Sequence, residues 1–106
     1  MRSRTEGLAM LFAVTCTDRA GALSVRLEHR AAHLAWAGAA HSPVKMGGPL
    51  LDGEGQPAGS LLIVEAEDGE QLRAILKDDP YARADLFADV VWMPFKWTLK
   101  APEGLA

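Results

Sequence analysis

The chain has 106 residues, of which 49% are hydrophobic and 24% charged. This size and composition predict one globular domain and exclude a disordered, fibrous or disulfide-stabilised protein. The net charge of −3 arises from 11 basic and 14 acidic residues that are scattered along the chain. We therefore do not expect a nucleic-acid partner, because that binding draws on clustered Lys and Arg. The single cysteine, Cys16, cannot form an intrachain disulfide and agrees with a cytoplasmic location.

Nothing in the sequence predicts an association with a membrane. No apolar run reaches the roughly 18 residues that are needed to cross a bilayer. Arg2 and Arg4 precede an apolar stretch, residues 8–14, and this order loosely imitates an export signal. The same stretch is the best strand candidate of the chain, so we expect it to belong to the fold.

The first half of the chain predicts a strand, a helix and a second strand. Residues 8–17 are a β-compatible run followed by turn-forming residues. Ser24 is placed to cap a helix over residues 25–39. The inward face of that helix is expected to carry apolar residues at spacings of four, three and four: Leu27, Ala31, Leu34 and Gly38. Pro43 stops the helix, and residues 44–51 form a weaker strand.

The second half repeats this order after a loop. Residues 52–59 contain three glycines and a proline, and their letters match a dinucleotide fingerprint. The following segment, residues 60–65, reads as a strand rather than a helix, so we interpret the loop as a flexible hairpin. Asp68 caps a second helix that stops near Lys77. Residues 81–86 read as a short turn and residues 89–98 as the last strand.

The element order β-α-β-β-α-β is that of the ferredoxin-like α+β fold. It predicts a four-stranded antiparallel sheet with both helices on one face. Both faces of the first and last strands are apolar, with alternating sets such as Val14 against Ala13 and Trp92 against Met93. The helices can cover only one face. We therefore expect a homodimer that buries the other one.

Several polar side chains are candidates for chemistry. His29 and His33 are four residues apart on the first predicted helix, a spacing that can hold zinc, but a third ligand is missing and no metal is expected. Cys16 lies on the apolar strand face and reads as a small core residue. Arg26, Arg30, His33 and Ala37 form a second face of that helix, which could line a cleft, although periodicity alone favours a solvated flank. Asp79 precedes Pro80 and could simply cap a short turn.

Four segments together resemble the YciI-like (YCII-related) family, from about residue 8 to 97. They are Arg-Ala-Ala-His-Leu at 30–34, Gly-Gly-Pro-Leu at 47–50, Asp-Pro-Tyr at 79–81 and Pro-Phe-Lys at 94–96. The resemblance implies a dimeric α+β barrel and a His-Asp pair in a cleft, here His33 and Asp79. It also implies small-molecule chemistry, since one branch of the family removes chloride from a chlorinated hydroxyquinol. The loop at 52–59 and three tryptophans depart from the family pattern.

A histidine oriented by a carboxylate suits proton transfer near neutral pH without a cofactor. We therefore expect a lyase, dehydrochlorinase or isomerase in which His33 and Asp79 act together. Arg30, Gly48, Pro49 and Tyr81 are the candidate substrate-binding residues. Arg30 is placed to hold an anionic group, so the expected ligand is a small anionic or aromatic molecule. The alternative is a non-catalytic ligand-binding or accessory module whose His-Asp pair only organises the cleft.

Overall fold

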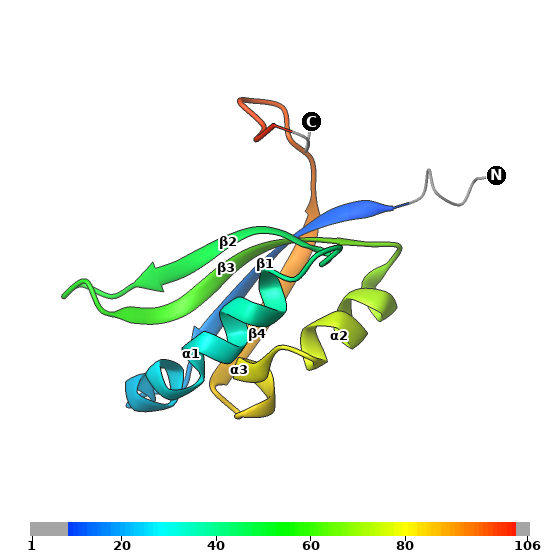
Figure 1. Ribbon diagram of the computed structural model, residues 1–106. Coiled ribbons are helices and arrows are strands. Elements are labelled where there is room, and N and C mark those ends of the chain that lie inside the picture. Colours follow the sequence, from blue (N-terminus) through cyan, green and yellow to red (C-terminus); the bar gives the residue numbers. More distant parts are fainter. Residues whose placement is uncertain (1–8, 104–106) are drawn as a thin grey trace.

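The computed structural model describes residues 9–103, so Arg2, Arg4 and Leu8 lie outside the described residues. The described chain forms one sheet with helices packed against it (Figure 1). Its elements are β1 (Met10–Asp18), α1 (Leu23–Ala37), β2 (Val44–Leu51), β3 (Pro57–Ala66), α2 (Gly69–Lys77), α3 (Pro80–Arg83) and β4 (Phe87–Phe95). None of the helices found in residues 9–103 is long and apolar enough to span a bilayer.

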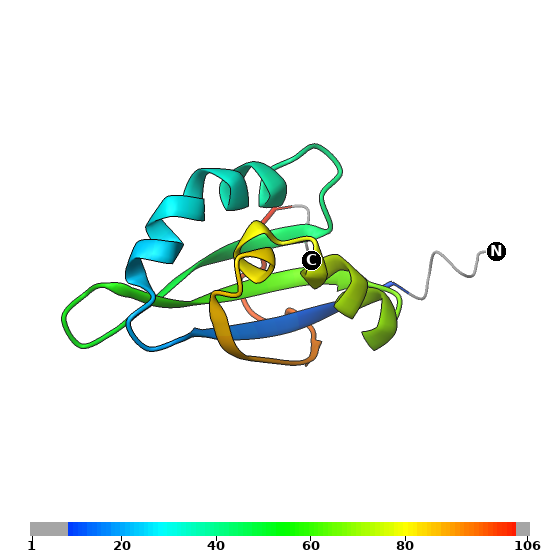
Figure 2. The same ribbon diagram turned by 90° about the horizontal axis from the view of Figure 1, so that it is seen from below.

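The strands within the described chain pair in the order β2-β3-β1-β4, and each neighbouring pair is antiparallel. The helices all lie on one side of this sheet (Figure 2). This arrangement confirms the predicted ferredoxin-like α+β fold. The predicted turn at 81–86 begins as the short helix α3. The last strand starts at Phe87, slightly earlier than expected, and ends at Phe95.

The main core lies between the sheet and α2. Alternate residues of β1 and β3 point toward the helices, and Leu72 of α2 is fully buried against them. The buried members of this core are Phe12, Val14, Cys16, Leu62, Val64, Ala66 and Leu72. A smaller cluster of Ala22, Tyr81 and Leu86 joins the start of α1 to α3. The position of α3 therefore depends on apolar contacts with α1.

The chain between the elements is held by side-chain caps. Asp68 accepts a hydrogen bond from the backbone N–H of Gln71 and caps α2, as the sequence predicts. Asp52 accepts from the N–H groups of Glu54 and Gln56 and closes the turn between β2 and β3, where Gly55 has a φ of 82°. Strand β3 follows this turn directly, so the segment is a hairpin and does not open a helix as a dinucleotide-binding loop must.

The predicted start and cap of the first helix are wrong. It begins at Leu23 with Ala22 as the N-cap, and no side chain caps it, so Ser24 lies inside the helix. Its start is set by the burial of Ala22 against Tyr81 and Leu86.

The expected inward face of α1 is exposed. Leu27 and Leu34 are 54% and 56% exposed, whereas Arg26 and His33 are buried. Periodicity fails here because the buried stripe of the helix is polar, with its charges paired to groups on other elements.

The second face of the sheet is apolar, as the strand patterns predict. In the register of the sheet, Ala13 of β1 lies between Ile63 and Met93, and Thr15 lies between Leu61 and Val91. Val91 and Met93 are 53% and 66% exposed on this face. No helix of the described chain lies on that side (Figure 2).

The close approach of β2 and β3 yields a test of the sheet geometry. A Cβ added at Gly47 would lie 2.6 Å from Leu62 Cδ2 and 2.9 Å from the Leu61 carbonyl oxygen, whereas one at Gly48 would meet nothing within 4 Å. We expect Gly47→Ala to lower the free energy of unfolding by about 1–3 kcal/mol. Gly48→Ala should cause no loss. Urea unfolding of both variants measures the difference, and equal stabilities would contradict the packing at Gly47.

Candidate active site

His33 and Asp79 meet between α1 and the start of α3. The Nδ1 atom of His33 lies 2.8 Å from Oδ1 of Asp79, and both residues are buried, at 8% and 1% exposed. The same Oδ1 accepts a hydrogen bond from the backbone N–H of Tyr81 at 2.9 Å. Asp79 is thus both the N-cap of α3 and the partner of His33. A carboxylate bonded to Nδ1 keeps the proton there and leaves Nε2 as the free nitrogen.

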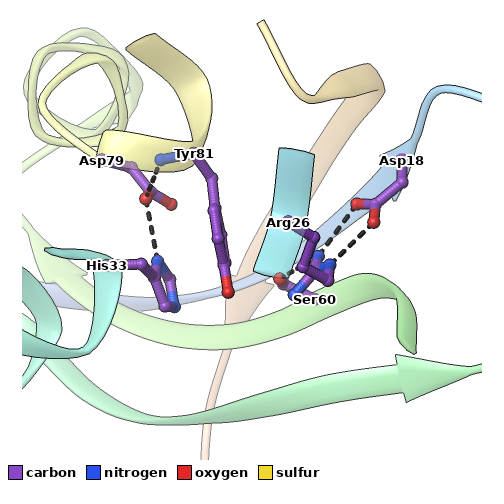
Figure 3. A network of polar contacts seen from close by, with 6 residues as sticks. All are labelled: Asp18, Arg26, His33, Ser60, Asp79 and Tyr81. Carbon is purple, nitrogen blue, oxygen red and sulfur yellow. Dashed lines mark hydrogen bonds and ion pairs between the residues drawn. The ribbon is translucent and has the colours of Figure 1, made fainter. Parts of the chain in front are cut away.

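Tyr81 lies between His33 and Arg26 (Figure 3). Its ring stacks on the imidazole with centroids 4.1 Å apart and planes 15° from parallel, and the Arg26 guanidinium carbon lies 4.5 Å from the ring centroid. Burial raises the pKa of the Tyr81 phenol, while the positive charge of Arg26 opposes that shift. The stack leaves the His33 ring little freedom to rotate.

Arg26 is held by a buried ion pair. Its Nε and Nη2 donate to the two carboxylate oxygens of Asp18 at 2.7 and 2.8 Å, and Nη2 also donates to Ser60 Oγ at 2.9 Å. Burial alone would lower the pKa of Arg26, but the hydrogen bonds and charge of Asp18 give a net rise. The guanidinium is therefore a fixed positive charge beside Tyr81.

A cavity of about 490 Å³ opens between α1 and the β2–β3 hairpin. The structure places all four predicted substrate-binding residues on its wall, together with His33: Arg30, Gly48, Pro49 and Tyr81. Leu27 and Leu34, which are exposed in the fold, form part of its apolar lining. Arg26, Arg30 and Lys45 also line it, and no Asp or Glu of the described chain does. The cavity therefore favours ligands with electron-rich or anionic oxygens.

Sequence reasoning missed the network around Arg26, although the resemblance implied a cleft at His33. The available signal was the helical spacing of Arg26, Arg30 and His33, which periodicity assigned to a solvated flank. Asp18 and Ser60, which pair with Arg26, lie on β1 and β3. Nothing in the spacing of these residues along the chain marks them as neighbours.

The remaining candidate residues lie apart from the cavity. His29 Nε2 is 3.9 Å from the carboxylate of Glu28 on the same helix, and no group of three or more His, Cys, Asp or Glu side chains that could hold a metal occurs in residues 9–103. Cys16 is buried, and desolvation together with the charge of Asp79 raises its pKa to about 12. A thiol in that state is a poor nucleophile, which agrees with a core role.

Comparison with known proteins agrees with this arrangement. The model of the YCII-related domain matches residues 10–96. The chain belongs to the YCII-related family. No curated protein matches the sequence.

One solved structure shows the same family and fold. This YCII-related domain is similar to a 5-chloro-2-hydroxyhydroquinone dehydrochlorinase from Burkholderia phenoliruptrix AC1100, solved in complex with 2,5-dihydroxybenzoquinone, with 35% identity and a TM-score of 0.74. The match covers 82% of this chain and 94% of that one.

More distant structures share the fold alone. One is a cofactor-independent oxygenase from Streptomyces nogalater, with 15% identity, a TM-score of 0.51 and coverage of 91% and 99% of the two chains. Another is a protein of unknown function from Nitrosomonas europaea, with 19% identity, a TM-score of 0.55 and coverage of 92% and 98%.

The buried Arg26–Asp18 pair yields a test of how the site is supported. The two side chains are 4% and 6% exposed, so Arg26→Gln leaves the Asp18 charge buried without its partner. We expect this change to cost about 3–5 kcal/mol of unfolding free energy. The exposed pair of Arg83 and Asp78 is the matched control, and Arg83→Gln should cost about 1 kcal/mol or less. Similar losses in thermal unfolding of the two variants would contradict a stabilising role for the buried pair.

Proposed function

We propose that this protein is an enzyme that transfers protons on a small hydroxylated aromatic substrate, with His33 as the general base and acid. The observation that carries the proposal is the contact of His33 Nδ1 with Asp79 at the wall of a cavity that has cationic but no acidic lining residues in the described chain. Such a histidine can accept and return a proton through Nε2 near neutral pH. The chemistry needs no cofactor.

Each residue of the site then has a distinct role. Asp79 keeps the His33 ring in one tautomer and stabilises the imidazolium once it forms. Arg30 holds an anionic oxygen of the substrate, since its guanidinium is permanently charged. Gly48 and Pro49 contribute the opposite wall on β2, and Tyr81 orients the His33 ring by stacking.

The relative from Burkholderia suggests a substrate class, namely chlorinated hydroquinols. In a dehydrochlorination, His33 would move one hydroxyl proton to the ring carbon that bears chlorine, which makes that carbon tetrahedral. Loss of a second hydroxyl proton then forms a carbonyl and expels chloride. The sum is the loss of one proton and one chloride ion, and a hydroxybenzoquinone forms without any oxidant.

The proposal is tested by chloride release from 5-chloro-2-hydroxyhydroquinone. We expect His33→Ala to lower kcat/KM by about 10²–10⁴-fold. Asp79→Asn should also lower it, and the double variant should lose little more than His33→Ala alone, because the pair acts in one step. Asn retains an oxygen that can cap α3, so the fold should persist. His29→Ala is the matched control on the same helix and should keep full activity.

Chloride release that survives in His33→Ala would contradict the assigned base. A protein that binds 2,5-dihydroxybenzoquinone in calorimetry but turns over no chlorinated hydroquinol would instead support the alternative function, a ligand-binding module. The expected cytoplasmic location stays a prediction.

We also propose that the protein is a homodimer that buries the second face of the sheet. Val91 and Met93 are exposed there, as is Leu61 at 41% on the other side of β1, and such an apolar surface is usually covered in a stable protein. A specific interface should bury more than about 1,200 Å² in total.

Light scattering at micromolar concentration measures the dimer directly. Met93→Glu places a charge on the proposed interface and should yield monomers, while it costs the isolated chain little because Met93 is exposed. Ala74→Glu, on the exposed side of α2, is the control and should leave the dimer intact. A native protein that is monomeric at this concentration would refute the proposal.

A further inference from the structure

The cavity at His33 has room for more than one aromatic ring. Its volume is about 490 Å³, whereas a cavity of about 150 Å³ holds benzene. His33 and Leu27 both line it from α1, and their spacing on the helix corresponds to about 9 Å along its axis. A ring with a hydroxyl at His33 therefore fills only part of the cavity.

One end of the cavity lies toward the turn of the β2–β3 hairpin, which extends past the start of α1 (Figure 2). Arg26 of α1 donates to Ser60, and Ser60 pairs with Pro49 across the two strands. Nearer the turn, Leu51 pairs with Pro57. We call this end the outer arm of the cavity, and its apolar lining residues are Leu27, Pro49, Leu51 and Pro57.

The outer arm is an apolar surface that a ligand could cover. Leu27 and Leu51 line the cavity from α1 and from β2, and they are 54% and 60% exposed. Arg26, which lies beside them, is buried and already paired with Asp18. The outer arm therefore gains from contact with an apolar group, because that contact removes the two leucines from water.

The surrounding charges disfavour an ionised group in the outer arm. Arg26 and Arg30 line the cavity and repel a cation. Asp52 and Glu54 follow Leu51 in the turn and repel an anion. An uncharged group meets neither penalty.

The turn of the hairpin holds the outer arm in place. The backbone N–H of Asp52 donates to the carbonyl oxygen of Gln56 at 2.8 Å, and Asp52 Oδ1 accepts from the N–H groups of Glu54 and Gln56. Leu51 and Pro57 flank this turn and are thus fixed opposite each other. The hairpin loop, which departs from the family pattern, is therefore the segment that lengthens the cavity.

We propose that the substrate is a hydroxylated aromatic ring with an uncharged alkyl or aryl substituent, which lies in the outer arm between Leu27 and Leu51. The ring itself lies at His33 and Arg30. This inference rests on the proposed function for the position of the ring, and it adds the substituent.

Calorimetry with 2,5-dihydroxybenzoquinone and its ring-butylated derivative tests the inference. We expect the butylated ligand to bind about tenfold more tightly or better, because each methylene group that leaves water contributes about fourfold in affinity. A third ligand with a carboxylate at the end of the same chain should lose this gain, because the outer arm offers its charge no partner.

Variants of the outer arm locate the gain. Leu27→Asn and Leu51→Asn each change an exposed side chain, so the fold should persist. In both variants the ratio of the two affinities should fall to about threefold or less. Leu99→Asn is the matched control, because Leu99 is 79% exposed and lies outside the lining of this cavity. It should keep the ratio of the unchanged protein.

Equal affinities of the unchanged protein for the two ligands would overturn the inference and leave the proposed reaction standing. A ratio that stays the same in both outer-arm variants would also overturn it. If Leu51→Asn instead lowers the mass found by light scattering, the exposed leucines belong to an interface between chains, which contradicts the inference as well. Because no turnover is measured, a missing chloride release would count against the proposed function alone, whereas binding of neither ligand would contradict both.

Discussion

The site depends on the hydrogen bonds that the buried carboxylate of Asp79 accepts. Asp79 ends the chain segment after α2, begins α3, and receives the ring of His33 from α1. A buried charge in this position must be satisfied by donors, and Oδ1 obtains two of them. Because the same oxygen serves the backbone of Tyr81 and the imidazole, the orientation of the His33 ring is coupled to the start of α3. One carboxylate therefore both caps α3 and orients the candidate catalytic histidine.

A second buried charge supports this arrangement from the opposite side. Arg26 is clamped by Asp18 and Ser60, and its guanidinium faces Tyr81 (Figure 3). Tyr81 is thereby stacked between two groups that are each held by a carboxylate from another element. Helix α1 is thus joined to the rest of the protein by the polar contacts of Arg26 and His33, at positions where apolar side chains such as leucine would otherwise be buried. This choice leaves Leu27 and Leu34 free to line a cavity.

Much of the fold follows from local sequence patterns. Strand β2 occupies the predicted residues, Asp68 caps its helix, and the alternation in β1 distinguishes the two faces of the sheet. These features depend on neighbours within a few residues.

The buried face of α1 could not be predicted in the same way. Burial of Arg26 and His33 requires partners on β1, β3 and α3, and periodicity contains no information about such distant partners. The family motifs named His33, Asp79, Arg30 and Tyr81, but no motif marked Arg26.

The cavity at His33 lies away from the face proposed for dimerisation. Its walls come from α1, the β2–β3 hairpin and Tyr81, on the helix side of the sheet. The apolar face proposed for dimerisation is on the other side. In the proposed dimer, each subunit would hold its own ligand site, and occupancy of one site would have no obligatory effect on the other. Saturation by a ligand of this cavity should follow a simple hyperbola, and affinity per subunit should remain constant on dilution.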